Sequence, residues 1–341
     1  MDIEVFKCIF YGRLEFGKER SYRQVVEFYE NRTVNHYRNL VALKAEEYFN
    51  EENYSLEVHP RIIVNISKKQ WANTIALLKF AAGFAVAGQF DAWMLDNGKA
   101  LDQHHIEPQN DKKVVQTFLK GRQLVKSEGM EQEAIDTLSK TIHRYEKHAL
   151  AYERRGKVQV LLRNYKDAIY DYTKSINFNP YNPEPYIGRA FIYMMEENYA
   201  EAREDLVKAS RNSIPHQDIY WKAIRMKAEM EIKLGNFEAA IKDLERFTKR
   251  NFADDSPNRK FRKLAFNNYG IALREQDKIK EAIEKFDEAA KIEEGNLITP
   301  ADPLLERGIA RKRAGMKGYK TDLKKAADLG SERAAALLAE G

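Results

Sequence analysis

Residues 149–180 read ALAYERRGKVQVLLRNYKDAIYDYTKSINFNP, and the rest of the chain can be interpreted from this stretch. Apolar and aromatic residues recur at the spacing of a helix face on both sides of a short polar turn at residues 163–165. The turn leaves room only for an antiparallel return. The small residues Gly156 and Ala168 fall where the two helices must approach closely. Such a pair cannot bury its apolar face alone, so we expect the pattern to recur.

The pattern does recur along the chain. A small residue in the middle of each first helix serves as a register mark, and it is Gly121, Gly156, Ala190, Ala228, Gly270 and Gly308. A second mark is the small residue that opens each return helix, namely Ala134, Ala168, Ala202, Ala240 and Ala282. A large residue follows the second mark by four positions, as Leu138, Tyr172, Leu206, Leu244 and Phe286. Matches that stay in register over so many units indicate a repeat array.

This pattern closely resembles the tetratricopeptide repeat, and the resemblance covers about two thirds of the chain. It implies a mainly α protein, a right-handed α-solenoid of helix-turn-helix repeats, with residues 113–341 forming about six helix pairs. The last unit departs from the pattern, because Tyr319 stands where Ala is usual. Residues 324–334 resemble the second half of a Sel1-type repeat and would form a terminal capping helix.

The N-terminal part shows different patterns. Residues 2–17 and 21–49 have helical periodicity, which predicts a helical hairpin over residues 1–53. This hairpin is either a degenerate first repeat or unrelated to the array.

Residues 54–112 predict a small α+β insert with strands at 56–58, 62–66, 90–95 and 100–106. Ser67 would cap a helix from Lys68 to about Ala87 that ends at Gly88. Asn97-Gly98 predicts a hairpin, because both residues accept positive φ.

Composition limits the classes of protein. The chain has 341 residues, 43% of them hydrophobic and 32% charged, with a formal charge of +5. This small basic excess gives weak support to nucleic-acid binding. Cys8 is the only cysteine, which excludes an internal disulfide, and we expect it to be a buried structural thiol. We see neither a secretory signal nor a membrane span, and we expect a cytoplasmic protein.

The resemblance nominates a binding surface on the first helix of each repeat, which would form the inner wall of the superhelix. The nominated residues lie three before, one after or four after a register mark, positions that we call the first-helix face. They are Arg122, Lys157, Ile187, Phe191, Met194, Arg225, Glu229, Asn267, Arg274 and Lys312. Some members of the family grip a C-terminal carboxylate with a set that includes Asn. Arg122, Lys157 or Phe191 stands in that place here, so we do not expect this mode.

The first-helix face predicts a protein or peptide partner with acidic residues flanking an apolar anchor, since Arg and Lys hold carboxylates and Met adapts its shape. The alternative is that its basic members are only a solvated face and its apolar members pack between helices. We expect no catalysis, no cofactor and no metal. No phosphate-binding Gly-rich loop or catalytic motif occurs, and His104 and His105, adjacent on a strand, would point to opposite faces.

Two other functions remain open at this stage. The first is RNA binding through basic residues of the array, namely Arg122, Arg154, Lys157, Arg189, Lys222, Arg225 and Arg274. The second is a sensing or enzymatic function in residues 54–108, for which a deep polar pocket would be the sign. We expect Trp71, Trp93 and Trp221 to be core residues; Tyr220 and Trp221 would become candidate hot spots if they were exposed.

Overall fold

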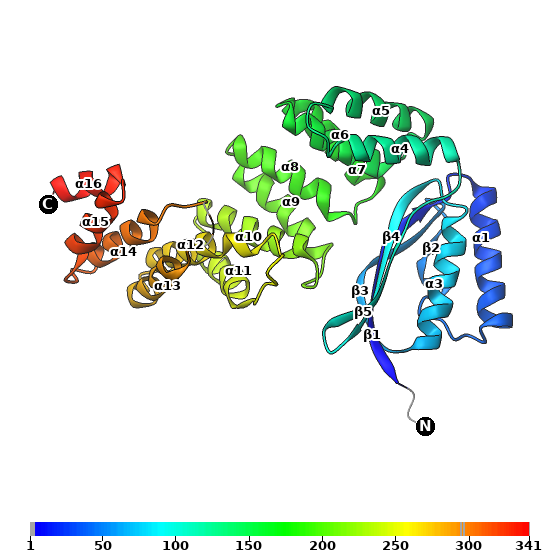
Figure 1. The fold of residues 1–341 in the computed structure, drawn as a ribbon, viewed down its shortest axis with the longest axis horizontal. Helices are drawn as coiled ribbons and strands as arrows, with labels where there is room; N and C mark the ends of the chain where they lie inside the picture. Colours follow the sequence, from blue (N-terminus) through cyan, green and yellow to red (C-terminus); the bar gives the residue numbers. More distant parts are fainter. Residues whose placement is uncertain (1–3, 294, 296, 341) are drawn as a thin grey trace. The chain divides into compact units, whose positions relative to one another are not determined.

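The computed structural model describes residues 4–293, 295 and 297–340 (Figure 1). Most of the described residues are helical, and the chain divides into two compact units, residues 1–189 and 190–341. The helical part consists of helix pairs, as the sequence predicts. The small sheet lies near the N-terminus.

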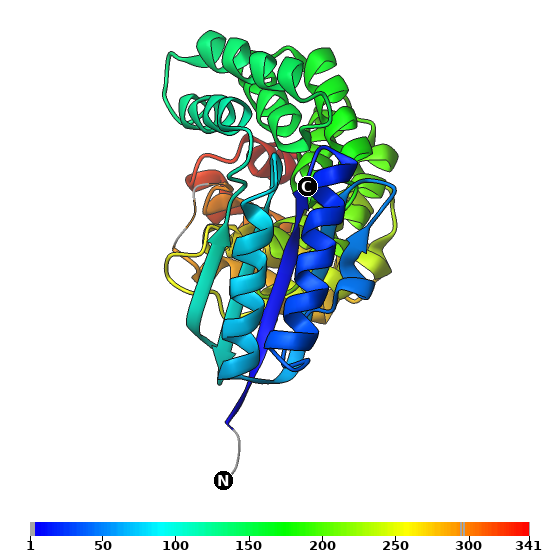
Figure 2. The same ribbon diagram turned by 90° about the vertical axis from the view of Figure 1, so that its right-hand side faces the viewer.

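The first unit begins with a five-stranded antiparallel sheet of order β2-β3-β1-β4-β5. Its strands are β1 (Val5–Glu15), β2 (Phe49–Asn50), β3 (Ser55–Ser67), β4 (Ala87–Asp96) and β5 (Lys99–Ile106). The helices among them are α1 (Glu19–Asn31), the π-helical η1 (Arg32–His36), α2 (Ala45–Tyr48) and α3 (Lys68–Ala82). Helices α1 and α3 lie side by side on one face of the sheet (Figures 1 and 2).

The predicted helix over residues 2–17 is wrong, because residues 5–15 form β1, the central strand of the sheet. Phe6, Cys8 and Phe10 alternate into the core beneath α3, while Ile9 between them is also fully buried. When a strand is buried on both faces, its apolar residues need not alternate with polar ones. The spacing of apolar residues then does not distinguish the strand from a helix. The helical hairpin over residues 1–53, and with it the degenerate repeat, is therefore wrong.

The rest of this α+β module agrees in part with the sequence. Asn97 and Gly98 have positive φ and join β4 to β5, which confirms the hairpin. Ser67 caps α3 in a capping box with Gln70. However, α3 ends at Ala82 rather than near Ala87, and Gly88 lies inside β4. A Cβ on Gly88 would stand 2.0 Å from the carbonyl oxygen of Arg13 in β1, so this close strand pairing requires glycine.

The segment expected as two strands around Pro60 is one strand, β3. It pairs with β1 along one side, whereas β2 pairs with only its first residues. Proline is tolerated there because the outer side of β3 is an edge, where no ladder hydrogen bond is lost. The apolar alternation on both sides of Pro60 therefore belongs to a single element.

The helix pairs of the first unit are α4 (Lys112–Leu124) with α5 (Glu131–Arg144) and α6 (Ala149–Leu161) with α7 (Tyr165–Phe178). Helix α8 (Pro183–Met195) spans the division between the units. The ring of Tyr172 on α7 fills the space that a side chain would need at Gly156 and at Gly188. One aromatic side chain thus packs against the two first helices α6 and α8.

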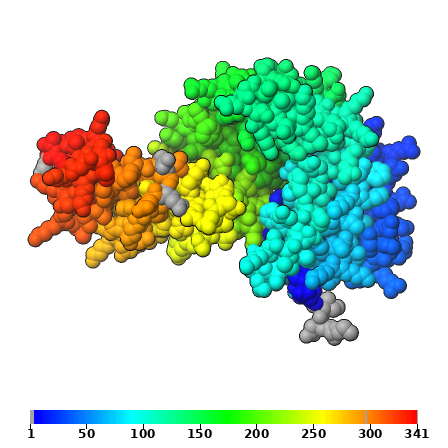
Figure 3. Space-filling view, in the orientation of Figure 1, coloured from blue at the N-terminus to red at the C-terminus, as the bar shows by residue number. Residues whose placement is uncertain are grey.

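The second unit continues the array and ends on a single helix. Its helices are α9 (Tyr199–Arg211), α10 (Asp218–Lys233), α11 (Phe237–Lys249), the short 3-10 helix η2 (Arg259–Phe261), α12 (Arg262–Glu275), α13 (Ile279–Lys291), α14 (Ala301–Arg313), α15 (Tyr319–Asp328) and α16 (Glu332–Ala339). In the space-filling view the helix pairs from yellow to red follow one another in chain order (Figure 3). The longer interval before Gly270 holds η2 and the irregular chain before it.

The two sequence marks meet inside each repeat. Ala134, Ala168, Ala202, Ala240 and Ala282 are fully buried. A Cβ placed on the first mark would clash with the large residue of the partner helix. It would stand 2.7 Å from Leu138 at Gly121, 2.5 Å from Phe286 at Gly270 and 2.9 Å from Leu323 at Gly308. The small residues therefore set the helix separation, as the sequence predicts.

A second constraint within the repeats was not anticipated from the sequence. A basic residue directly before the register mark forms a buried ion pair with an aspartate on the return helix. The pairs are Arg155–Asp171, Lys227–Asp243 and Arg307–Asp322. Two of them, Arg155–Asp171 and Arg307–Asp322, are bidentate, because Nε and Nη2 of the guanidinium donate to the two oxygens of one carboxylate. They fix the rotation of the two helices about their axes, whereas the small residues fix their separation.

We expect Gly270→Ala to lower the free energy of unfolding by about 1–3 kcal/mol, because the methyl group overpacks the contact with Phe286. Gly156→Ala is expected to cost less, because its Cβ would lie 3.1 Å from the Tyr172 ring rather than 2.5 Å from a ring carbon. Urea denaturation measures both values. Adding Phe286→Leu to Gly270→Ala should recover part of the loss. Equal costs for the two alanine variants would contradict the packing explanation.

Candidate functional site

The first helices of consecutive repeats contact one another within each unit. Helix α4 contacts α6 in the first unit, and α12 contacts both α10 and α14 in the second. Residues at the same register position on these neighbouring helices therefore form rows.

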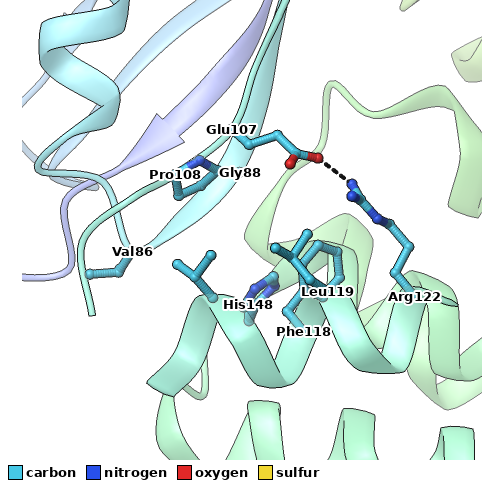
Figure 4. A pocket seen from close by; sticks show the side chains of 9 residues that line it. Val86, Gly88, Glu107, Pro108, Phe118, Leu119, Arg122 and His148 are labelled. Atoms are coloured by element: carbon cyan, nitrogen blue, oxygen red, sulfur yellow. Dashed lines mark hydrogen bonds and ion pairs between the residues drawn. The ribbon is translucent and has the colours of Figure 1, made fainter. Parts of the chain in front are cut away.

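In the first unit, Arg122 is bonded to a carboxylate from outside the repeats. Its Nη1 donates to Glu107 Oε1 at 2.5 Å, just after the end of β5 (Figure 4). His105 on β5 lies 3.2 Å from the same oxygen through Nε2 and 2.8 Å from Asp91 through Nδ1. These contacts link the sheet to the first repeat, and Arg122 is half-buried and already paired.

Burial, hydrogen bonds and neighbouring charges shift the pKa values of His105 and Glu107. The bond to Asp91, followed by the contacts with Glu107, raises the pKa of His105 against the effect of burial. Burial opposes ionisation of Glu107, but Arg122 and His105 outweigh it and lower the pKa of that carboxyl. Both charged forms are therefore favoured in the folded chain.

A cavity of about 10 Å³ lies beside this ion pair, between the sheet and α4 (Figure 4). Apolar side chains of Val86, Phe118 and Leu119 line it together with His148. Burial lowers the pKa of His148 to about 3, so the ring is neutral, and its Nδ1 accepts from the amide of Ala151 at the start of α6. This volume is that of about one water molecule. The cavity is a packing gap at the junction, too small for a substrate.

The other two predicted residues of the first unit differ in exposure. Lys157 is exposed, whereas Ile187 is only 3% exposed and belongs to the packing between helices. One turn before Lys157, the buried carboxyl of Glu153 lies beside Arg154, with Nε 3.1 Å from Oε2. Burial raises the pKa of Glu153. Lys157 is thus the predicted residue of this unit that offers a charge to solvent.

In the second unit, Phe191 and Met194 lie on the part of α8 after the division. The Phe191 side chain is 45% exposed, and Met194 is half-buried. An aromatic ring exposed to that extent on the first-helix face contrasts with the large aromatic residues that face partner helices, such as Phe247 and Phe286, which are fully buried. This pair is the apolar part of the candidate surface.

Arg225 and Glu229 form an ion pair on α10, with Arg225 Nη1 2.5 Å from Glu229 Oε1. The Arg225 guanidinium also stacks on Phe261, with Cζ 3.8 Å from the ring centroid. Burial raises the pKa of Glu229, although Arg225 opposes that shift. Arg225 is 5% exposed, and Asn267 on the neighbouring α12 is equally buried. Arg225 and Asn267 are thus withdrawn from solvent, and the side chain of Glu229 is 18% exposed.

Arg274 is paired as well, with Glu275 Oε1 at 2.9 Å from its Nη2 and with Glu306 through Nη1. Lys312 on α14 is exposed. Every arginine nominated from the sequence, in either unit, is thus engaged by one of the chain's own carboxylates, and Lys157 and Lys312 are the nominated cations that are exposed. The positive charge of the first-helix face is smaller than the sequence suggests.

The same pairing weakens the RNA alternative. Four of its basic residues have carboxylate neighbours within ion-pair distance, namely Arg122, Arg154, Arg225 and Arg274. Affinity for RNA depends on cations that neutralise phosphates, and a cation that is already paired contributes little to that term.

Other candidates of the sequence analysis lie in structural contacts. His104 lies 3.4 Å from Asp102 and beside the Trp71 ring, whereas His105 bonds Asp91 and Glu107, so the two histidines have different partners. Cys8 is buried, and burial raises the pKa of its thiol to about 12. Trp71, Tyr220 and Trp221 are buried, while Trp93 is half-buried. Tyr220 and Trp221 are therefore core residues and not exposed hot spots.

Sequence reasoning missed the partners that hold the arginines. Glu107 precedes the domain limit expected at residue 112, whereas Arg122 follows it. No helical or strand spacing in the sequence places these two residues next to each other. Phe261 follows an irregular segment whose path cannot be predicted from periodicity. The pairing of Arg225 with Glu229 could have been found, because residues four apart are neighbours on a helix.

Comparison with known proteins supports the assignment of the fold. Residues 225–296 match the family model for the tetratricopeptide repeat. The solved structure of YrrB, described as a TPR protein with an unusual peptide-binding site, is similar with a TM-score of 0.50 and 20% identity, over 60% of this chain and 97% of that one. PilF of Pseudomonas aeruginosa is similar with a TM-score of 0.50 and 16% identity, over 68% and 99% of the two chains. No curated protein matches the sequence.

The chain is therefore a helical-repeat protein with the tetratricopeptide fold and an added α+β module. Solenoids of stacked repeats form extended concave surfaces. Among the residues that the structure describes, no helix has the length and apolar character needed to cross a lipid bilayer.

We expect the contacts of His105 to stabilise the fold at acidic pH. Because its pKa is raised, the contribution is fully present below about 6.5 and is lost as the pH rises through the higher folded value. His105→Gln should lower the free energy of unfolding at pH 5.5 by less than about 1 kcal/mol, since the ring is half-exposed. The difference should vanish by pH 8.5. Glu107 keeps its charge throughout, because its pKa is lowered below 4.5.

Urea denaturation at the two pH values measures this effect. His36→Gln is the control, because that histidine is exposed on η1. A loss for His105→Gln that is the same at both pH values would show that the side chain acts by packing rather than by charge.

Proposed function

We propose that this chain is a non-catalytic scaffold that holds a peptide or protein partner on its first-helix face. The observation that carries the proposal is the exposure of Phe191 beside Met194, at register positions where the resemblance to tetratricopeptide repeats places ligand contacts. The large residues of the second helices are buried in the interior of the repeats. The first helices therefore carry the side chains that remain available for a partner.

The partner that fits this surface presents an apolar anchor flanked by acidic residues. Phe191 and Met194 would contact the anchor in the second unit, and the exposed Lys312 would hold a carboxylate. Lys157 would do so in the first unit. Arg122, Arg225 and Arg274 contribute less to such binding than their number implies, because each already neutralises one of the chain's own carboxylates. Ile187 supports the surface from below.

Three finer expectations from the sequence stay predictions. They are the Sel1-type character of the last helices α15 and α16, the limits of the domains at residues 53 and 112, and the cytoplasmic location. None of them is needed for the binding proposal, which rests on the first-helix face.

The proposal is tested by recovering partners from the native cell with the wild-type chain and with the triple variant Phe191→Ala, Met194→Ala and Lys312→Ala. Loss of the central apolar contacts should reduce recovery of a specific partner about tenfold or more. The matched control is Lys242→Ala with Glu238→Ala, an exposed pair on the second helix α11. If both variants recovered the same proteins in the same amounts as the wild type, binding would lie elsewhere.

A further inference from the structure

The last three helices of the second unit have a hydrophobic core of their own. One continuous core runs through the helix pairs α10–α11 and α12–α13, where it contains large side chains such as Trp221, Phe247 and Phe286. A separate and smaller core holds α14, α15 and α16 together, and its buried members are Ala301, Leu305, Leu323, Ala326 and Ala334. We call these three helices the terminal cap. Ala310 on α14 belongs to the larger core, but it contributes only a methyl group.

Charged side chains join the terminal cap to the preceding helix pair. Helix α14 contacts both α12 and α13. The ion pairs across this junction are Arg274–Glu306, Arg307–Asp287, Arg313–Glu275 and Arg313–Asp277. In the last two, Arg313 Nη1 lies 3.3 Å from Glu275 Oε2 and Nη2 lies 2.7 Å from Asp277 Oδ1. This junction therefore relies on charge, whereas α10–α11 and α12–α13 share a core of large apolar side chains.

The ion pairs of the junction form one network with ion pairs inside the cap. Arg307 also donates two hydrogen bonds to Asp322 on α15, and Glu306 lies 3.5 Å from Arg333 on α16. Several charges in a network stabilise more than isolated surface pairs do. The network remains open to dissolved ions, because the side chains of Asp287 and Arg313 are 38% and 42% exposed.

We propose that the terminal cap is a salt-sensitive element, which detaches from the array as the ionic strength rises while α10–α13 stay folded. The screening length of salt falls from about 10 Å at 0.1 M to about 3 Å at 1 M, which weakens attraction between solvent-accessible charges. The core of α10–α13 carries no charge for salt to screen. The cap therefore opens locally, without unfolding of the rest of the unit.

Detachment has two consequences for the chain. Three short helices with so small a core do not stay folded once they lose the array, because isolated helices of this length are marginal in water. Lys312 on α14 leaves the first-helix face together with the cap. Salt thus removes one of the exposed cations of that face. The inference goes beyond the proposed function and does not depend on it, because it concerns only how the repeats are held together.

Hydrogen–deuterium exchange of the full chain, measured by mass spectrometry, reports this opening helix by helix. At 1 M NaCl the amides of α14–α16 should exchange about tenfold faster than at 50 mM NaCl, because the junction is screened. The amides of α10–α13 should keep their rates. Equal acceleration in all these helices, or no acceleration in the cap, would overturn the proposal.

Asp287→Asn combined with Arg313→Gln tests the junction directly. Asp287→Asn removes a charge pair across the junction but leaves Arg307 bonded to Asp322 inside the cap. In the double variant the cap should exchange at 50 mM NaCl nearly as fast as the wild-type cap does at 1 M. The remaining salt effect should be less than about threefold, because most of the interaction that salt screens is gone. Unchanged exchange of α10–α13 in the same sample shows that the rest of the variant is folded.

The matched control is Glu238→Gln with Lys242→Gln, which removes an exposed ion pair within α11. Its cap should exchange as the wild-type cap does at both salt concentrations. If the double variant at the junction kept the full salt dependence of the wild type, these ion pairs would not hold the cap and the inference would be wrong.

Discussion

The close approach of the two helices within each repeat is the constraint on which the structure depends. In four of the six repeats a glycine in the first helix lies where the large residue of the return helix needs space, so that the ring of Phe286 occupies the volume of a side chain at Gly270. The alanine that opens the return helix in five of the repeats is fully buried. Once that separation is fixed, the return helix has one way to pack.

This constraint leaves the first helices with a surface. Buried ion pairs such as Arg155–Asp171 fix the rotation of the two helices about their axes. The large residues of the return helices are buried in the interior of the repeats. The first helices then contact one another in rows, and their remaining face carries the mixed apolar and polar residues. The chain neutralises most of the cations on that face with its own carboxylates. On that face, Lys157 and Lys312 are the nominated cations that stay exposed.

The repeats could be predicted from the sequence because their information is local. Glycine, alanine and a large residue recur at spacings that one helix pair fixes, and the structure confirms their packing at Gly121, Gly270 and Gly308. The first strand could not be predicted in the same way. The strand at residues 5–15 is central to the sheet and has buried side chains on both faces, so its apolar residues do not alternate strictly and their spacing does not distinguish it from a helix.

The sequence predicted which positions of the first helices belong to the candidate surface. It did not predict which of the side chains at those positions are paired with other residues of the chain. Register gives the place of Arg122 and Arg225 on their helices, whereas their partners depend on tertiary contacts. Glu107 reaches Arg122 from the end of a strand, and Phe261 reaches Arg225 from the short 3-10 helix η2. The ion pair with Glu107 neutralises Arg122, and the ion pair with Glu229 on the same helix neutralises Arg225.

The most direct test of the account is photo-crosslinking in the native cell with benzoylphenylalanine at either of two aromatic positions. One position replaces Phe191 on the first-helix face, and the other replaces Tyr170 on the return helix α7, whose side chain is similarly exposed. The account predicts a specific protein adduct from position 191 and none from position 170. An adduct from position 170 alone would show that partners bind the opposite side of the repeats.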